Sequence, residues 1–355
     1  APWRHELVVH RPSAAKAGDL AVLAVSGSER LGRELARRTG RPVATLSDVP
    51  NQPLYFGKRE DDLLAHTFAQ YLKTGEEDWP LLFPMTKAAV AAMDALAARG
   101  VAARFVVTGA SKRGWASWLA GVADERVIGI VPVVFDNLSF GAQMKHQSAV
   151  WGAYSEELSD YTLRGLQSQI GTPRGAKLVA MVDPIAYGPK LGRLRKLVVN
   201  GTNDPYWATD AIRHYWSALD GEKSVLYVPN GDHGIAHDER VLAATAEFVR
   251  RTDEGRALPK VELALRRESS RLEATIRANE PARAARVWLA RGTGADFRRA
   301  RFEALEATEH EGVFALATPL AATDSIAAFA EADFGDASSS FSLSTPMQVS
   351  SPLTQ

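Results

Sequence analysis

The chain has 355 residues, and its 42 Lys and Arg residues balance 42 Asp and Glu residues, so no net positive charge favours nucleic-acid binding. Hydrophobic residues make up 46% and charged residues 24%, a composition typical of globular proteins, and the length favours two domains. The chain lacks cysteine, which excludes disulfides and thiolate nucleophiles, and no apolar run approaches the roughly 20 residues of a membrane span.

Up to about residue 252, short apolar strands alternate with longer amphipathic segments. The hydrophobic periodicity predicts strands over 5–10, 20–27, 42–50, 104–109, 127–135, 196–201 and 224–230, and helices over 30–40, 86–100, 111–123, 208–220 and 238–251. Nearly continuous apolar strands separated by helices indicate a mostly parallel sheet that is covered by helices on both faces.

Two stretches, 51–84 and 137–190, interrupt this alternation. The first is rich in Pro, acidic and aromatic residues. The second contains more helical sequence than a crossover requires, and we expect it to form a cap over the ends of the strands. We therefore predict a first domain over residues 1–252.

Beyond a polar, Gly- and Pro-containing linker over 250–260, the hydrophobic period changes to two. About seven short alternating strands follow within a hundred residues, which is typical of a small β-sandwich of immunoglobulin or fibronectin type. We predict this second domain over residues 260–355.

The segment TGASKRG (108–114) contains the strongest chemical signal, because a serine stands where an apolar strand runs into a helix. Ser111 follows the small residues Gly109 and Ala110, as a nucleophile elbow requires where strand and helix backbones come close together. The usual G-x-S-x-G pattern has its second glycine where Arg113 stands here, and this chain places a glycine one position later. The alternative is a serine that caps the helix and performs no chemistry.

Two further residues stand just beyond apolar strands in the order expected of an α/β-hydrolase, in which acid and histidine follow the serine. Asp204 follows the strand at 196–201, and His233 follows the strand at 224–230. In a Ser-Asp-His triad, Ser111 would attack a carbonyl, His233 would carry the proton, and Asp204 would orient the imidazole. Asp210 and Asp232 are competing candidates for the acid.

The surroundings of this serine suggest further roles. The backbone N–H of Lys112 would bind the oxyanion together with an N–H near Gly27 or Ser28. We expect Trp115, His146, Trp151, Tyr206 and Trp207 to be candidates for substrate contact, with core packing as the alternative for each aromatic residue.

The side chains of Lys112 and Arg113 could bind an acidic substrate group or form ion pairs with Glu60, Asp61 or Asp62. The pair His233 and His237 lacks the glutamate of an H-E-x-x-H motif, so we expect no metal and no cofactor.

These residues resemble the PhoPQ-activated pathogenicity-related protein family, most specifically in GASKRGW (109–115). The resemblance extends over the segments 49–56, 59–68, 79–96, 107–138, 198–211, 227–234, 287–298 and 341–349. It implies an α/β-hydrolase-like domain with a sandwich-like tail, and a G-x-S-x-x-G elbow as the family's own form. It also implies export from the cytoplasm, so we expect a secreted or periplasmic protein whose signal peptide has been removed.

The resemblance says less about the substrate. Bacterial members of the family are tied by name to a virulence regulon, eukaryotic relatives include a secreted repressor of cell proliferation, and a similar elbow occurs in glucuronoyl esterases. We expect a serine hydrolase that cleaves an ester or amide of a small molecule or peptide, with peptides slightly favoured. The alternatives are a non-catalytic signalling or binding protein on a hydrolase fold and a carbohydrate esterase. The oligomeric state stays open.

Overall fold

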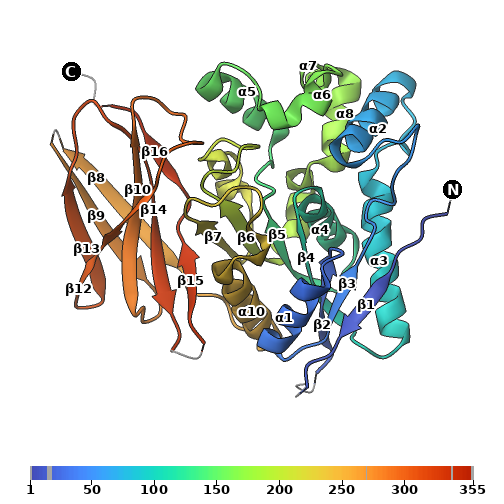
Figure 1. Cartoon of the computed structure of the whole chain (residues 1–355), viewed down its shortest axis with the longest axis horizontal. Coiled ribbons are helices and arrows are strands. Elements are labelled where there is room, and N and C mark those ends of the chain that lie inside the picture. Colours follow the sequence, from blue (N-terminus) through green and yellow to red (C-terminus); the bar gives the residue numbers. More distant parts are fainter. Residues whose placement is uncertain (1, 14–17, 269, 337–338, 353–355) are drawn as a thin grey trace.

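The computed structural model of the chain describes residues 2–13, 18–268, 270–336 and 339–352. Its first part is a mostly parallel sheet with helices on both faces (Figure 1). The strands in spatial order are β1 (Leu7–His10), β3 (Val43–Leu46), β2 (Leu20–Val25), β4 (Arg104–Ala110), β5 (Val127–Val133), β6 (Arg195–Gly201) and β7 (Lys223–Val228). The pairs from β3 to β7 are parallel, and β1 runs antiparallel to β3.

Successive side chains of each strand point to opposite faces of the sheet, so the strands contribute to two hydrophobic cores. In β2, Leu23 belongs to the core beneath α3 (Leu82–Ala98) and α4 (Lys112–Ala123). Its neighbour Val22 points to the opposite core, beneath α1 (Glu29–Thr39) and α10 (Glu239–Asp253). The sheet is therefore buried on both sides, as the continuous apolar runs predicted.

The helix expected over residues 208–220 is replaced by two short 3-10 helices, η3 (Ala211–His214) and η4 (Trp216–Ala218). Tyr215 lies between them at a φ of −138°, and its side chain is fully buried. Its hydroxyl donates to Asp136 beyond the end of β5, a distant contact that outweighs the helical periodicity of the segment.

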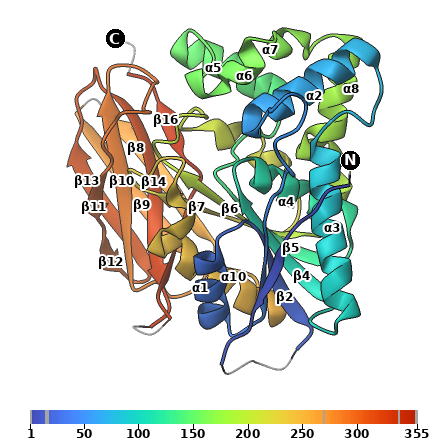
Figure 2. The same cartoon turned by 45° about the vertical axis from the view of Figure 1, so that its right-hand side comes forward.

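Helices cover the carboxyl ends of the parallel strands (Figures 1 and 2). The cap consists of α5 (Phe140–Trp151), η1 (Glu156–Leu158), α6 (Ser159–Thr162), α7 (Leu166–Gln169) and α8 (Pro173–Val182). After the cap, η2 (Pro184–Tyr187) and α9 (Gly188–Gly192) pack against α4 and lead to the start of β6. Helix α2 (Glu60–Thr74), from the stretch 51–84 that interrupts the predicted alternation of strands and helices, lies beside α8. A further short helix, η5 (Ile235–His237), precedes α10. No helix in the described part of the chain is long and apolar enough to cross a bilayer.

The C-terminal part is built from two antiparallel sheets. One contains β8 (Val261–Glu268), β9 (Arg271–Ala278), β13 (Val313–Pro319) and β12 (Thr308–His310). The other contains β15 (Phe341–Ser344), β14 (Ser325–Phe334), β10 (Ala284–Gly292), β11 (Glu303–Glu306) and β16 (Gln348–Ser350). The chain passes from one sheet to the other at Ala307, which separates β11 from β12.

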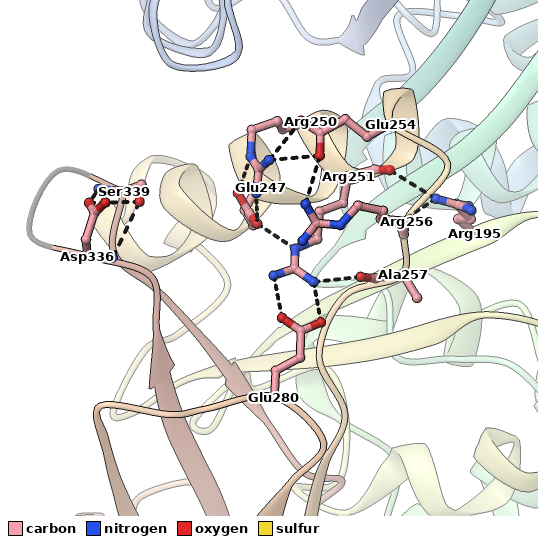
Figure 3. A network of polar contacts seen from close by, with 10 residues as sticks. All are labelled: Arg195, Glu247, Arg250, Arg251, Glu254, Arg256, Ala257, Glu280, Asp336 and Ser339. Carbon is pink, nitrogen blue, oxygen red and sulfur yellow. Dashed lines mark hydrogen bonds and ion pairs between the residues drawn. The ribbon is translucent and has the colours of Figure 1, made fainter.

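The two parts share one sheet. Strand β15 pairs antiparallel with β7 at Ser344 and Val225, so the parallel sheet continues into the sandwich. At this junction Arg251 of α10 donates two hydrogen bonds to Glu280, at 2.6 and 2.8 Å, in the β9–β10 connection (Figure 3). Arg251 also binds Glu247 of its own helix, and thus ties α10 to the sandwich.

Candidate active site

Ser111 occupies a strained turn between β4 and α4. Its φ of 56° and ψ of −129° place it in a region that residues other than glycine rarely adopt, at a cost of about 1–3 kcal/mol. The hydroxyl makes no capping hydrogen bond to α4, so the alternative of a helix-capping serine does not describe this turn. The turn instead has the conformation expected of a nucleophile elbow.

The glycines on either side explain the unusual spacing of the motif. A Cβ on Gly109 would lie 2.6 Å from the carbonyl oxygen of Arg113, and one on Gly114 would lie 3.0 Å from the oxygen of Gly109 and 3.1 Å from that of Val133. The close approach of α4 to β4 and β5 thus occurs at Gly114. Position 113 tolerates a side chain, which extends to Glu60 at 2.9 Å.

Of the three candidate acids, Asp204 is the one that is hydrogen-bonded to His233. The Nδ1–H of His233 donates to Oδ2 of Asp204 at 2.8 Å, and the Tyr206 N–H donates to Oδ1 at 3.0 Å. Asp210 accepts from His146 at 2.6 Å, whereas Asp232 accepts from the Gly234 N–H in its own loop. Since a carboxylate can only accept, the contact to Asp204 leaves the Nε2 atom of His233 as the basic nitrogen.

His233 and Ser111 line the same cavity, the polar cleft, which is bounded by the loops after β2 and β3 and by α10. The Nε2 atom of His233 has no hydrogen-bond partner within the described part of the chain. The ring of Tyr206 stacks on the imidazole, with 4.2 Å between centroids, and limits its rotation. His237 also lines this cleft, but the described residues contain no group of three or more side chains placed to hold a metal ion.

Two of the three residues expected to supply oxyanion donors remain candidates in the structure. The N–H of Lys112 begins α4, where the first amides of a helix have no partner within the helix. Gly27 lines the polar cleft with Ser111. Ser28 is engaged elsewhere, because its N–H donates to the Ser26 hydroxyl at 3.1 Å and its own hydroxyl caps α1.

The cations beside the serine are already paired. The buried Nζ of Lys112 lies 2.9 Å from Glu60 and 3.4 Å from Asp61, and Arg113 also binds Glu60. Burial would raise the pKa of Glu60, but the hydrogen bonds from Arg113 and Lys112 outweigh it and lower this pKa to about 2. Neither cation is therefore available to bind an acidic group of a substrate.

Ser111 also lines a second cavity beneath the cap, which we name the cap pocket. Three of the aromatic residues singled out from the sequence, Trp115, Tyr206 and Trp207, line it. The structure does not bring His146 and Trp151 to either cavity. His146 is held by Asp210, and Trp151 lies 3.9 Å beneath the guanidinium of Arg298.

The sandwich contacts the two loops that carry Asp204 and His233. The sequence did not predict this contact. In the connection between β10 and β11, the carbonyls of Arg298 and Ala300 accept from the Asn203 amide at 3.0 and 2.8 Å. The backbone N–H of Phe302 donates to the side-chain oxygen of Asn230 at 2.8 Å, and the Phe302 carbonyl accepts from the Asn230 amide at 3.0 Å. No local pattern signals these contacts, because the partners are at least 72 residues apart.

The strand order, the strained serine turn and the positions of the loops after β6 and β7 define an α/β-hydrolase-like protein with an appended antiparallel β-sandwich. The family described as PhoPQ-activated pathogenicity-related protein matches residues 1–298, and the chain belongs to this family.

Similarity to individual proteins is more distant. The chain is 36% identical over 226 residues to autocrine proliferation repressor protein A of Dictyostelium discoideum, and the match covers 60% of this chain but 46% of that relative. A puromycin-hydrolysing peptidase of Mycobacterium tuberculosis superposes with a TM-score of 0.47 at 17% identity, over 70% of this chain and 37% of its own. An acylaminoacyl peptidase of Pyrococcus horikoshii superposes with a TM-score of 0.48 at 12% identity, over 69% of this chain and 39% of its own.

Proposed function

We propose that the protein is a serine hydrolase that uses Ser111, His233 and Asp204. The observation that carries this proposal is the hydrogen bond between His233 and Asp204, which leaves a basic nitrogen in the cavity that the strained Ser111 also lines. Strain of this kind is retained at functional sites, where the surrounding structure maintains it.

In the proposed reaction, the Ser111 oxygen attacks a carbonyl carbon while Nε2 of His233 accepts the hydroxyl proton. The backbone N–H groups of Lys112 and Gly27 bind the resulting oxyanion. The bond to the leaving group then breaks, and the leaving group takes the proton from His233. Water, deprotonated by the same histidine, releases the acid product and restores the serine.

The substrate is an ester or an amide, with peptides slightly favoured. We further propose that the protein acts outside the cytoplasm, that residues 1–252 form the catalytic unit and that residues 260–355 form the sandwich unit. The rival function is non-catalytic binding or signalling, which the name of the Dictyostelium relative makes worth testing.

The first test is labelling with a fluorophosphonate probe, with thermal melting to verify that each variant is folded. We expect the wild type to label and Ser111→Ala and His233→Ala to lose labelling. Asp204→Asn should reduce the turnover of an activated ester by a factor on the order of 10⁴, because the neutral amide no longer holds the imidazole in the required tautomer. Asp210→Asn is the matched control, since Asp210 is likewise buried and bound to a histidine.

The proposed assignment would be contradicted if Ser111→Ala were labelled as strongly as the wild type. Equal losses of turnover in Asp204→Asn and Asp210→Asn would also contradict it. A wild-type protein that neither labels nor cleaves any ester or peptide would favour the non-catalytic function.

A further inference from the structure

A residue that lines the cap pocket with the serine has a buried side-chain oxygen without a hydrogen-bond partner among the described residues. Asn137 follows β5 at the carboxyl edge of the sheet, is 8% exposed and lines this pocket together with Ser111. Its Oδ1 atom is buried and has no hydrogen-bond partner among the described residues. Buried polar groups are almost always paired in folded proteins, so an unpaired acceptor in a binding cavity indicates a ligand that donates to it.

Other polar groups in the pocket are satisfied by the protein itself. The Tyr161 hydroxyl donates to Asp61, the indole N–H of Trp115 donates to the Val182 carbonyl, and Lys112 is ion-paired to Asp61. A second unpaired amide oxygen belongs to Gln167 of α7, but that side chain is only partly buried. Of the described residues that line this pocket, Asn137 is thus the one that is more than nine-tenths buried and has an unpaired side-chain oxygen.

The remaining wall of the pocket is apolar and aromatic. It includes Phe68, Trp115, Phe135, Phe140, Met144 and Trp207. Because Lys112 is neutralised, the pocket offers no free cation to a carboxylate. A bulky apolar group therefore fits this wall, and a charged or sugar-like group does not.

We propose that the cap pocket and Asn137 bind the acyl part of an N-acylated amino acid or peptide. The apolar side chain occupies the pocket, the adjacent amide N–H donates to Oδ1 of Asn137, and the neighbouring carbonyl carbon meets Ser111. The inference rests on the proposed function and specifies its substrate class. Asn137 contributes binding and selectivity, and the proton and bond changes are those given above.

The test compares p-nitrophenyl esters that differ in one group, using the purified full chain. One ester is that of N-acetyl-L-phenylalanine, another is that of 3-phenylpropanoic acid, which lacks the acetamido group, and the third is the acetate. We expect the wild type to prefer the first ester over the second by about tenfold or more in kcat/KM, because a site built to bind an N–H discriminates against its absence. The acetate should be the poorest of the three.

Two variants separate selectivity from stability. Asn137→Leu, of similar size, should remove the preference for the acetamido ester and leave the 3-phenylpropanoate within about threefold of wild type. Gln167→Leu is the matched control, which removes the other unpaired amide oxygen among the described residues that line the pocket and should keep the preference. Asn137→Ala replaces Asn137→Leu where the latter does not fold.

Equal wild-type rates on the two phenyl esters, preference for the acetate, or equal losses on both phenyl esters in Asn137→Leu would overturn the inference. Fluorophosphonate labelling of Ser111 without cleavage of any of the esters would also overturn it, while the proposed function would stand. Absence of both labelling and cleavage would overturn the two together.

Discussion

Among single residues, Asp136 is a buried carboxyl group whose pKa is raised. It is 3% exposed at the end of β5, and the Tyr215 hydroxyl donates to it. Burial raises its pKa to about 7, the charges of Asp204 and Asp210 add to this effect, and the hydrogen bond from Tyr215 opposes it. The folded protein therefore holds a proton on Asp136 at pH values where the unfolded chain releases it.

This proton makes stability depend on pH. The contribution of Asp136 is fully present below pH 4 and is lost as the pH rises to about 7, because the raised pKa belongs to the folded state. The variant Asp136→Asn should therefore gain free energy of unfolding relative to wild type, by up to about 4 kcal/mol between pH 4 and pH 8. Urea unfolding at both pH values would measure this gain, and a constant difference would contradict it.

At the scale of elements, the β10–β11 connection joins the sandwich to the loops that carry Asp204 and His233. Asn203 adjoins the acid, Asn230 lies three residues before the histidine, and both bind backbone groups of this connection. The Asn230 N–H also donates to the Thr202 hydroxyl at 2.7 Å, which links the two loops to each other. The sandwich thus helps to position the acid and the base.

Removal of these contacts should lower both the catalytic rate and the stability. We expect Asn230→Ala to lower the turnover of an activated ester by about tenfold, because small displacements of catalytic groups are costly. Each lost hydrogen bond should cost about 0.5–1.5 kcal/mol of stability. Asn279→Ala is the control, since Asn279 also binds a backbone amide, that of Lys260, but outside the two cavities. Equal rates in the two variants would show that the connection has only a structural role.

At the scale of the whole molecule, the parallel sheet and the sandwich are parts of one folded body. Beyond the β7–β15 pair, the rings of Tyr227 and Phe329 lie 5.2 Å apart across the junction, and Leu258 of the segment expected to be a linker is buried. A sheet without β15 would expose the edge of β7, and exposed edges favour aggregation.

We therefore expect the full chain to unfold in a single calorimetric transition whose calorimetric and van't Hoff enthalpies agree. Glu280→Ala should lower the Tm of that one transition, because Arg251 would be left with one carboxylate partner fewer at the junction. Two separate transitions, or a Glu280→Ala effect confined to one of two transitions, would contradict this expectation.

Much of this organisation can be predicted from local sequence. Hydrophobic residues that recur every two residues, or every three to four, indicate which side of a strand or helix is buried. A serine that follows small residues at a strand end indicates a nucleophile elbow. The second glycine of the elbow motif comes one position later than in the usual pattern, and local sequence does not explain why. Only the packing of α4 against β4 and β5 explains why Gly114, and not position 113, must be small.

Other features depend on residues that are distant in sequence. From the sequence, Asp210 is expected within a helix and Asp232 adjoins the histidine, but only the folded loops show that Asp204 is the one bound to His233. The unpaired Asn137 and the pairing of Lys112 likewise arise from three-dimensional contacts. The sequence by itself determines most strands of the sheet and their buried faces, because these follow from local periodicity. The tertiary structure decides hydrogen-bond partners, because these form only when the sheet brings separate loops to one edge.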